Sequence, residues 1–365
     1  MSSPLLRAAS SLNVPLGLQL YSVRDQLPKD FDGTLKQLGA LGFHEVESAG
    51  YFNHSAADAK AAIAAAGLNL VSAHYPMPML RTKLDEIISF SKAVGNGTVV
   101  CSSPALKDPA KLKTMTPEQR HHAFTLEDWQ WNAENLNSIG EKVHAAGLNF
   151  AYHNHYTEFH TTDGKVPYDE LMRLTDPAKV TMEMDCGWVV IGGGQPVEFL
   201  RKYAKRITML HVKDFKPIKI TPGVGADAEP SPIELGKGGI IDYKPIFAEA
   251  AKGGNIKHVF VEQEAFTVPP MDSLKIDAED ASRVRVLEHD IPVTAAEEDR
   301  IRRKKAFEEA AKVRKIYEEL VLKKTPETIV QIGTIQQIQM AVPGTKPVQI
   351  APAKAVEQPE PVAGD

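Results

Sequence analysis

Eight short apolar segments, separated by stretches with helical periodicity, limit how this chain can fold more than any other feature. The pattern runs from about residue 16 to residue 267. Gly42, Gly67 and Gly147 each follow a helical stretch directly before the next apolar run, as helix C-terminal caps do. We expect strands at 16–21, 43–47, 68–74, 97–101, 148–153, 179–185, 207–212 and 257–262. We expect helices near 31–41, 55–66, 81–94, 126–146, 167–174, 195–204 and 242–252.

Eight strands with intervening helices predict a closed parallel (β/α)8 barrel, the TIM-barrel fold. A doubly wound open sheet is the alternative. Such a sheet carries a glycine-rich phosphate loop after its first strand when it binds a dinucleotide. Here Leu20-Tyr21-Ser22-Val23-Arg24 occupies that position, so the barrel is the better interpretation.

Polar residues alternate with apolar ones along the last four predicted strands. In a barrel the apolar set packs outward against the helices, and the polar set points inward. His153, Asp185, His211 and Glu262 then meet at the carboxyl ends of the strands, where barrel active sites form. Buried charges are costly unless they are paired or coordinated. These residues are therefore predicted to bind one divalent metal ion, and the mixed nitrogen and oxygen set suits Mn²⁺, Mg²⁺, Co²⁺ or Zn²⁺.

Other inward residues are candidates for holding a substrate. Glu47 and His74 could bind hydroxyl or carbonyl groups, and Tyr21 and Trp188 could form an apolar wall against a sugar ring. Each of them could equally have a packing role. The predicted substrate-binding residues are Tyr21, Glu47, His74, Glu183 and Trp188.

Bulk properties exclude several classes of protein. A net charge of -5 and a pI near 6.2 argue against a nucleic-acid partner. No apolar run is long enough to cross a membrane, so no membrane partner is expected. The two cysteines, Cys101 and Cys186, form no disulfide framework, which favours a reduced, cytoplasmic location.

The composition changes after about residue 279. We therefore predict a catalytic barrel domain at 1–279 and a C-terminal extension at 280–365. Residues 296–323 are rich in charge with a thin apolar stripe, which predicts an amphipathic helix. It would pack on the barrel or on another subunit, so a homo-oligomer through this extension is possible. The Pro-, Gln- and Val-rich tail that follows is predicted to be irregular.

Several motifs resemble those of the sugar phosphate isomerase/epimerase family, the xylose-isomerase-like barrels. The resemblance covers about residues 15–264. It implies that the metal is held by the residues ending the fifth to eighth strands, which are His153, Asp185, His211 and Glu262. The motifs include Gly17-Leu18-Gln19-Leu20-Tyr21-Ser22-Val23-Arg24-Asp25, Tyr152-His153-Asn154-His155, Glu183-Met184-Asp185, Leu210-His211-Val212-Lys213-Asp214 and Val261-Glu262-Gln263.

Two departures from the family pattern bear on the chemistry. Ketose epimerases have a catalytic Glu at the position of His153, so here His153 itself, His155 or Glu158 would have to act as the base. Glu158 could also replace His153 as a ligand. The related endonuclease IV needs a His shortly after the sixth-strand Asp, where this chain has Trp188, which argues against DNA repair.

The first functional hypothesis is a metal-dependent isomerase or epimerase of a ketose or related sugar. Glu262 or a histidine of the 153/155 pair would take a proton from the carbon next to the carbonyl, giving an enediolate. Lys213 would neutralise the developing charge. The predicted catalytic residues are Glu262, His155, Glu158 and Lys213.

The second hypothesis is a lyase or dehydratase that acts on a keto-inositol or a 3-keto-glycoside after the same first step. The third is a non-catalytic barrel that binds a sugar. All three predict a small sugar or keto-polyol as the ligand.

Overall fold

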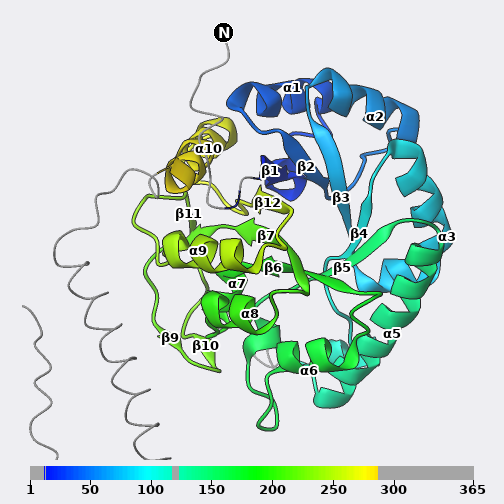
Figure 1. Ribbon diagram of the computed structural model, residues 1–365, viewed down its shortest axis with the longest axis vertical. Coiled ribbons are helices and arrows are strands. Elements are labelled where there is room, and N and C mark those ends of the chain that lie inside the picture. Colours follow the sequence, from blue (N-terminus) through cyan, green and yellow to red (C-terminus); the bar gives the residue numbers. More distant parts are fainter. Residues whose placement is uncertain (1–11, 13, 117–122, 287–365) are drawn as a thin grey trace, which may run out of the picture. The chain divides into compact units, whose positions relative to one another are not determined.

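Eight parallel strands close into a barrel at the centre of the protein (Figure 1). The computed structural model describes residues 12, 14–116 and 123–286. All of them belong to the first of two units, residues 1–291. The strand order is β1-β12-β7-β6-β5-β4-β3-β2, which confirms the predicted (β/α)8 barrel. The barrel strands are β1 (Leu16–Gln19), β2 (Glu45–Ser48), β3 (Asn69–Tyr75), β4 (Thr98–Cys101), β5 (Asn149–His153), β6 (Thr181–Asp185), β7 (Ile207–Val212) and β12 (His258–Val261).

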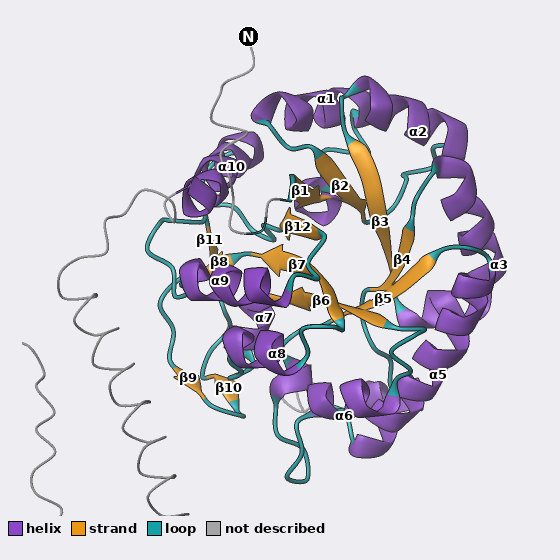
Figure 2. Cartoon of the chain, in the orientation of Figure 1, coloured by secondary structure: helices purple, strands orange, loops and turns teal. Residues whose placement is uncertain are grey.

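Helices surround the strands and supply the outer layer of the barrel (Figure 2). Most helix ends agree with the prediction, but α3 begins four residues early, at Met77. Pro78 lies in its first turn, where proline is tolerated because the backbone amides there have no helical partner. The helices between barrel strands include α1 (Phe31–Leu41), α2 (Ala56–Ala65), α3 (Met77–Val94), α5 (Leu126–Ala145), α6 (Pro167–Leu174), α8 (Pro196–Lys202) and α9 (Tyr243–Gly253).

The prediction did not include several short elements. A one-turn helix, α7 (Cys186–Ile191), begins directly after β6, and Asp185 caps it by accepting a hydrogen bond from the Trp188 amide at 2.8 Å. Two small antiparallel pairs lie between β7 and α9. They are β8 (Asp214–Phe215) with β11 (Pro232–Ile233), and β9 (Ile220–Thr221) with β10 (Gly225–Ala226).

A further helix, α10 (Pro270–Val286), follows the last barrel strand and runs across the domain boundary predicted at residue 279. The predicted helix at 296–323 and the tail after it lie outside the described residues. Within the described part of the chain, no helix is both long and apolar enough to cross a membrane.

The interior of the barrel is apolar below the level of the predicted site. Val100, Ala151, Met209 and Phe260 form a buried cluster separate from the larger core between strands and helices. Gly17 faces the same space, because a Cβ atom there would lie only 2.4 Å from the Phe260 ring. Phe260 also points inward, two residues before Glu262, and closes the barrel beneath the polar residues at its mouth.

A buried carboxyl group on α10 makes the stability of the barrel depend on pH. One oxygen of Asp277 accepts a hydrogen bond from the Leu235 amide at 2.7 Å, and the other has no hydrogen-bond partner. Burial raises the pKa of Asp277 to about 7, and the nearby carboxylates of Glu234, Asp280 and Asp214 add to the shift.

We expect Asp277→Asn to remove this pH dependence. An aspartate in the unfolded chain titrates near about pH 3.9. Between about pH 4 and pH 7 the folded protein therefore holds a proton that the unfolded chain has lost, and the free energy of unfolding falls as the pH rises. In urea unfolding, the variant should gain on the order of 2–4 kcal/mol relative to wild type between pH 5 and pH 8. Parallel pH profiles of the two proteins would contradict this assignment.

Candidate metal centre and pocket

The four residues predicted to bind a metal ion come together at the carboxyl end of the barrel. His153 and Asp185 end β5 and β6, His211 lies near the end of β7, and Glu262 follows β12. All four are buried, and one ligand atom of each lies within 4.8 Å of those of the others. Ligands at about 2.0–2.2 Å from a divalent ion lie at most about 4.4 Å apart. The cluster therefore fits one ion after small adjustments.

Two hydrogen-bond acceptors face each other within this cluster. His153 Nε2 lies 4.0 Å from Asp185 Oδ2, a buried oxygen that also lies 2.9 Å from Lys213 Nζ. Burial lowers the pKa of His153 well below its usual value, and the charge of His211 lowers it further, so the ring is neutral. Because His153 Nδ1 lies 3.1 Å from Glu183, the ring proton belongs on that nitrogen. The Nε2 lone pair and the carboxylate oxygen thus face a common point that suits a cation.

His211 lies between two carboxylates. Its Nδ1 is 3.2 Å from Glu262 Oε2, and its Nε2 is 2.8 Å from Glu47 Oε1. Burial would lower the pKa of His211, but Glu183 and the hydrogen bonds to Glu262 and Glu47 raise it well above its usual value. Binding of an ion at Nδ1 therefore has to release a proton, as is usual for histidine ligands.

The Lys213 ammonium group neutralises the carboxylates of the same cluster. Its Nζ lies 2.9 Å from Asp185 Oδ2 and 2.7 Å from Glu262 Oε2, and it also pairs with Glu264. Burial would lower the pKa of Lys213, but Asp185, Glu262 and Glu264 raise it well above its usual value. The lysine was predicted to neutralise charge on a substrate. In the structure its side chain is buried, and its charge is shared among protein carboxylates.

Glu47 and Glu183 were predicted to bind a substrate, but they lie too deep in the barrel to reach the pocket. Both are fully buried, and neither lines the pocket. Glu47 accepts hydrogen bonds from Gln19 Nε2 and Ser72 Oγ, and His74 Nε2 lies 2.7 Å from a carboxylate oxygen of each glutamate. These carboxylates contact the histidines of the cluster from below.

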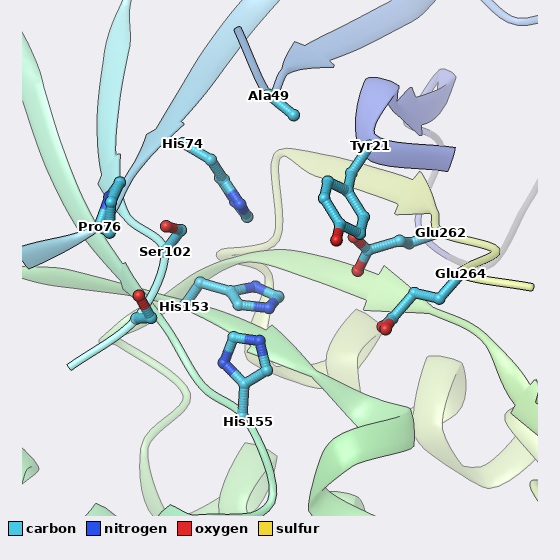
Figure 3. A pocket seen from close by; sticks show the side chains of 10 residues that line it. Tyr21, Ala49, His74, Pro76, Ser102, His153, His155, Glu262 and Glu264 are labelled. Carbon is cyan, nitrogen blue, oxygen red and sulfur yellow. The ribbon is translucent and has the colours of Figure 1, made fainter. Parts of the chain in front are cut away.

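A pocket of about 310 Å³ opens above the cluster (Figure 3). Two predicted ligands, His153 and Glu262, form part of its wall, so an ion held there would be accessible to a bound molecule. A volume of this size can hold a monosaccharide or a cyclic polyol. The pocket is lined by Tyr21, Ala49, His74, Pro76, Ser102, Ser103, His153, His155, Glu262 and Glu264.

Three of the remaining predicted residues differ in their access to the pocket. His155 lines it, and its ring lies 5.0 Å from that of His153. Tyr21 stands at the mouth, 44% exposed, with the Arg24 guanidinium 4.2 Å from its ring. Trp188 lies behind His155, packed against Phe215.

The structure does not bring Glu158 into the pocket. Its side chain is buried, and it accepts hydrogen bonds from the Tyr152 hydroxyl at 2.6 Å, the His155 amide at 3.0 Å and the Thr157 hydroxyl at 2.8 Å. The carboxylate therefore orders the turn after β5 and supports the backbone of His155.

The residues that line the pocket after β3 and β4 were not predicted as site residues. Pro76 directly follows β3, and Ser102 and Ser103 follow β4. Their position after a strand was the only signal that marked them, because Ser and Pro are also common turn residues. Glu264, two residues after Glu262, also lines the pocket.

The structure is thus a (β/α)8 barrel with a cluster of metal-binding residue types at the carboxyl ends of its strands. The chain belongs to the xylose isomerase-like TIM barrel family, whose model matches residues 35–284. The family predicted from the motifs is therefore confirmed.

The relatives by sequence include inosose dehydratases. One from Clostridium botulinum (strain Alaska E43 / Type E3) is 27% identical over 252 residues, covering 64% of this chain and 82% of that protein. One from Clostridium tetani (strain Massachusetts / E88) is 31% identical over 179 residues, covering 46% of this chain and 57% of that protein.

Solved structures share the fold at lower identity. A sugar phosphate isomerase/epimerase from Parabacteroides distasonis ATCC 8503 is 24% identical with a TM-score of 0.59, covering 73% of this chain and 96% of that one. The IOLI protein with a bound zinc atom is 14% identical with a TM-score of 0.58, covering 75% of this chain and 99% of that one. A barrel protein from Mycobacterium smegmatis in complex with magnesium is 15% identical with a TM-score of 0.53, covering 76% and 98%.

Proposed function

We propose that this protein is a divalent-metal-dependent lyase that removes water or an alcohol from an unphosphorylated keto-polyol or keto-sugar. The observation that carries the proposal is the position of His155 in the wall of the pocket, beside the cluster of His153, Asp185, His211 and Glu262. The inosose dehydratases among the relatives support the lyase over the isomerase, which was the first hypothesis from the sequence.

A divalent ion held by the four residues would supply Lewis-acid polarisation of the substrate carbonyl. The donor set of two imidazoles and two carboxylates favours Zn²⁺, Co²⁺ or Mn²⁺ over Mg²⁺, which prefers oxygen ligands. His155 reaches the pocket and is placed to take the proton from the carbon next to the carbonyl. Loss of the group on the following carbon then completes the elimination. Tyr21, with its phenol at the mouth, is placed to donate a proton to that leaving group.

The charge of the pocket favours an uncharged substrate. Its described lining contains two carboxylates, Glu262 and Glu264, and neither Lys nor Arg. Lys213, the nearest buried ammonium group, pairs with three carboxylates. A phosphate group beside Glu264 would meet a like charge, and the described lining offers no Lys or Arg to pair with it.

An isomerase or epimerase is the second candidate. An epimerase needs proton-accepting groups on both sides of the substrate. His155 follows β5 and Glu264 follows β12, and both line the pocket. Reprotonation by Glu264 would return an isomeric sugar in place of an elimination product.

Product analysis separates the two candidates. Metal-loaded protein is incubated in D2O with a keto-inositol, with a 3-keto-glucoside and with a phosphorylated keto-sugar, and the products are followed by NMR. We expect loss of water or aglycone from the unphosphorylated compounds. For the phosphorylated compound we expect kcat/KM to be at least about tenfold lower, because a tenfold change corresponds to about 1.4 kcal/mol and like charges side by side cost more than that. An isomeric sugar would support the second candidate. Absence of any exchange of carbon-bound hydrogen would contradict both.

A further inference from the structure

The two histidines of the cluster each have both ring nitrogens directed at carboxylates, but at two different levels of the barrel. The upper level consists of Asp185, which ends β6, and Glu262, which follows β12. The lower level consists of Glu47, within β2, and Glu183, two residues before Asp185 on β6. A histidine that binds a metal ion through one nitrogen commonly donates a hydrogen bond to a carboxylate from the other. The contacts of each ring show which nitrogen faces the metal site and which one donates a hydrogen bond to a carboxylate.

His153 uses Nδ1 for the lower level and Nε2 for the upper level. Its Nδ1 lies 3.1 Å from Glu183 Oε2, within hydrogen-bond distance. Its Nε2 lies 4.0 Å from Asp185 Oδ2, too far for a hydrogen bond. An ionised carboxylate only accepts hydrogen bonds. Glu183 therefore keeps the ring proton on Nδ1 and leaves the Nε2 lone pair directed upward.

His211 is oriented in the opposite sense. Its Nε2 lies 2.8 Å from Glu47 Oε1, and its Nδ1 lies 3.2 Å from Glu262 Oε2 and 3.9 Å from Asp185 Oδ2. The shorter contact is the lower one. Glu47 therefore holds the Nε2 proton, and Nδ1 is the nitrogen that faces the upper carboxylates.

His74 ties the two lower carboxylates together. Its Nε2 lies 2.7 Å from Glu47 Oε1 and 2.7 Å from Glu183 Oε2. Glu47 is fixed further by Gln19 Nε2 and Ser72 Oγ. The lower level is thus a connected hydrogen-bond network, in which His74 lines the pocket and the two glutamates do not.

A second grouping of possible ligands lies in this lower level. His74, His153, Glu183 and His211 also have ligand atoms within 4.8 Å of one another. An ion there would use His153 Nδ1 and His211 Nε2, the nitrogens that already contact Glu183 and Glu47. His153 and His211 belong to both groupings, so two ions bound at once would require each of these rings to lose both of its protons. The upper position leaves every lower contact in place, so it is the better one.

We propose that Glu47 and Glu183, linked by His74, are positioning residues that fix the protons of His211 on Nε2 and of His153 on Nδ1, so that His211 Nδ1 and His153 Nε2 bind the ion. The inference rests on the proposed metal centre. It adds that the affinity for the ion depends on two carboxylates that touch neither the ion nor the substrate.

The test measures metal affinity in Glu47→Gln and Glu183→Gln, using competition with a chromophoric chelator for Zn²⁺ and Co²⁺. Loss of an outer partner typically weakens metal binding about 10–100-fold, and we expect this for both variants. Glu45→Gln is the matched control. Glu45 lies on the same strand and the same face as Glu47 and pairs with a histidine, His258, at 2.8 Å, but it contacts neither His153 nor His211. Its affinity should equal that of wild type.

A measurement on the wild-type protein avoids any dependence on how the variants fold. In Zn²⁺-loaded protein with ¹⁵N-labelled histidine, the ring-nitrogen shifts should show one histidine bound through Nε2 with its proton on Nδ1. They should show a second bound through Nδ1 with its proton on Nε2. Substitution of Asp185 should perturb both rings without moving the protons from the lower nitrogens.

The outcomes are distinct. Wild-type affinity in both variants, or the opposite pair of bound nitrogens, overturns the positioning role and leaves the proposed function standing. Binding of two ions per chain would show that the lower level also holds an ion, and it would overturn the positioning role. Loss of the ion in Glu183→Gln but not in Asp185→Asn would place the ion in the lower level and would overturn the positioning role too. A wild-type protein that binds no divalent ion overturns the proposed function and this inference with it.

Discussion

Asp185→Asn is expected to abolish binding of the divalent ion and all turnover while the barrel stays folded. The substitution removes the charged oxygen Oδ2, which is buried, pairs with the Lys213 ammonium group at 2.9 Å and lies 4.0 Å from His153 Nε2. Asparagine keeps an oxygen for the Trp188 amide, so the N-terminus of α7 stays capped. The loss of affinity should exceed the roughly 10–100-fold that removal of an outer partner costs.

Thermal or urea unfolding with and without metal provides the measurement. At a free-metal concentration 100 times the Kd, wild type should gain about 2.7 kcal/mol of stability. Asp185→Asn should gain none at that concentration. Asp242→Asn is the matched control, because Asp242 also caps a helix, α9, through the Lys244 amide at 3.1 Å and does not line the pocket. Equal stabilisation of wild type and Asp185→Asn by metal would exclude Asp185 as a ligand.

His155→Ala is expected to lower kcat/KM by about 10²–10⁴-fold, the usual contribution of a general base. The side chain lines the pocket and is not among the atoms grouped as possible ligands. Metal content should therefore be unchanged. The turn that carries residue 155 should also persist, because Glu158 accepts a hydrogen bond from the backbone amide of that residue.

Exogenous imidazole should restore part of the lost activity if His155 transfers a proton. His144→Ala, an exposed histidine in the last turn of α5, is the control and should keep full activity. Full activity of His155→Ala, or loss of metal from it, would move the proton transfer to another group. Glu264 would then be the next candidate, since it lines the same pocket.

The fold was predictable because its strands and helices follow from patterns of neighbouring residues. Strand alternation and helix caps act over a few residues, so the eight strands were located to within about two residues of their observed ends. The elements that were missed have weak local signals. The helix α7 has only six residues and depends on the Asp185 cap, and β8 to β11 are two-residue strands that exist only as pairs.

The sequence predicted which residues of the candidate site point into the barrel, but not how far along the barrel axis each of them lies. Strand parity indicated that His153, Asp185, His211 and Glu262 point inward, and the structure gathers all four. Parity does not say how far up the barrel a residue lies. Glu47 and Glu183 were therefore predicted to meet a substrate, although both are fully buried and contact the histidines of the cluster.

The sequence by itself determined the barrel, the inward set of polar residues and the family. Side-chain period and capping are properties of consecutive residues, so they can be read without coordinates. Only the tertiary structure decided which polar groups touch. It turned Lys213 toward three carboxylates, buried Glu158 under its own turn, and placed Glu47 against His211, 164 positions away along the chain. The closure of the barrel determines these partners. They could not be predicted, because contacts between strands far apart in the chain produce no periodic pattern in the sequence.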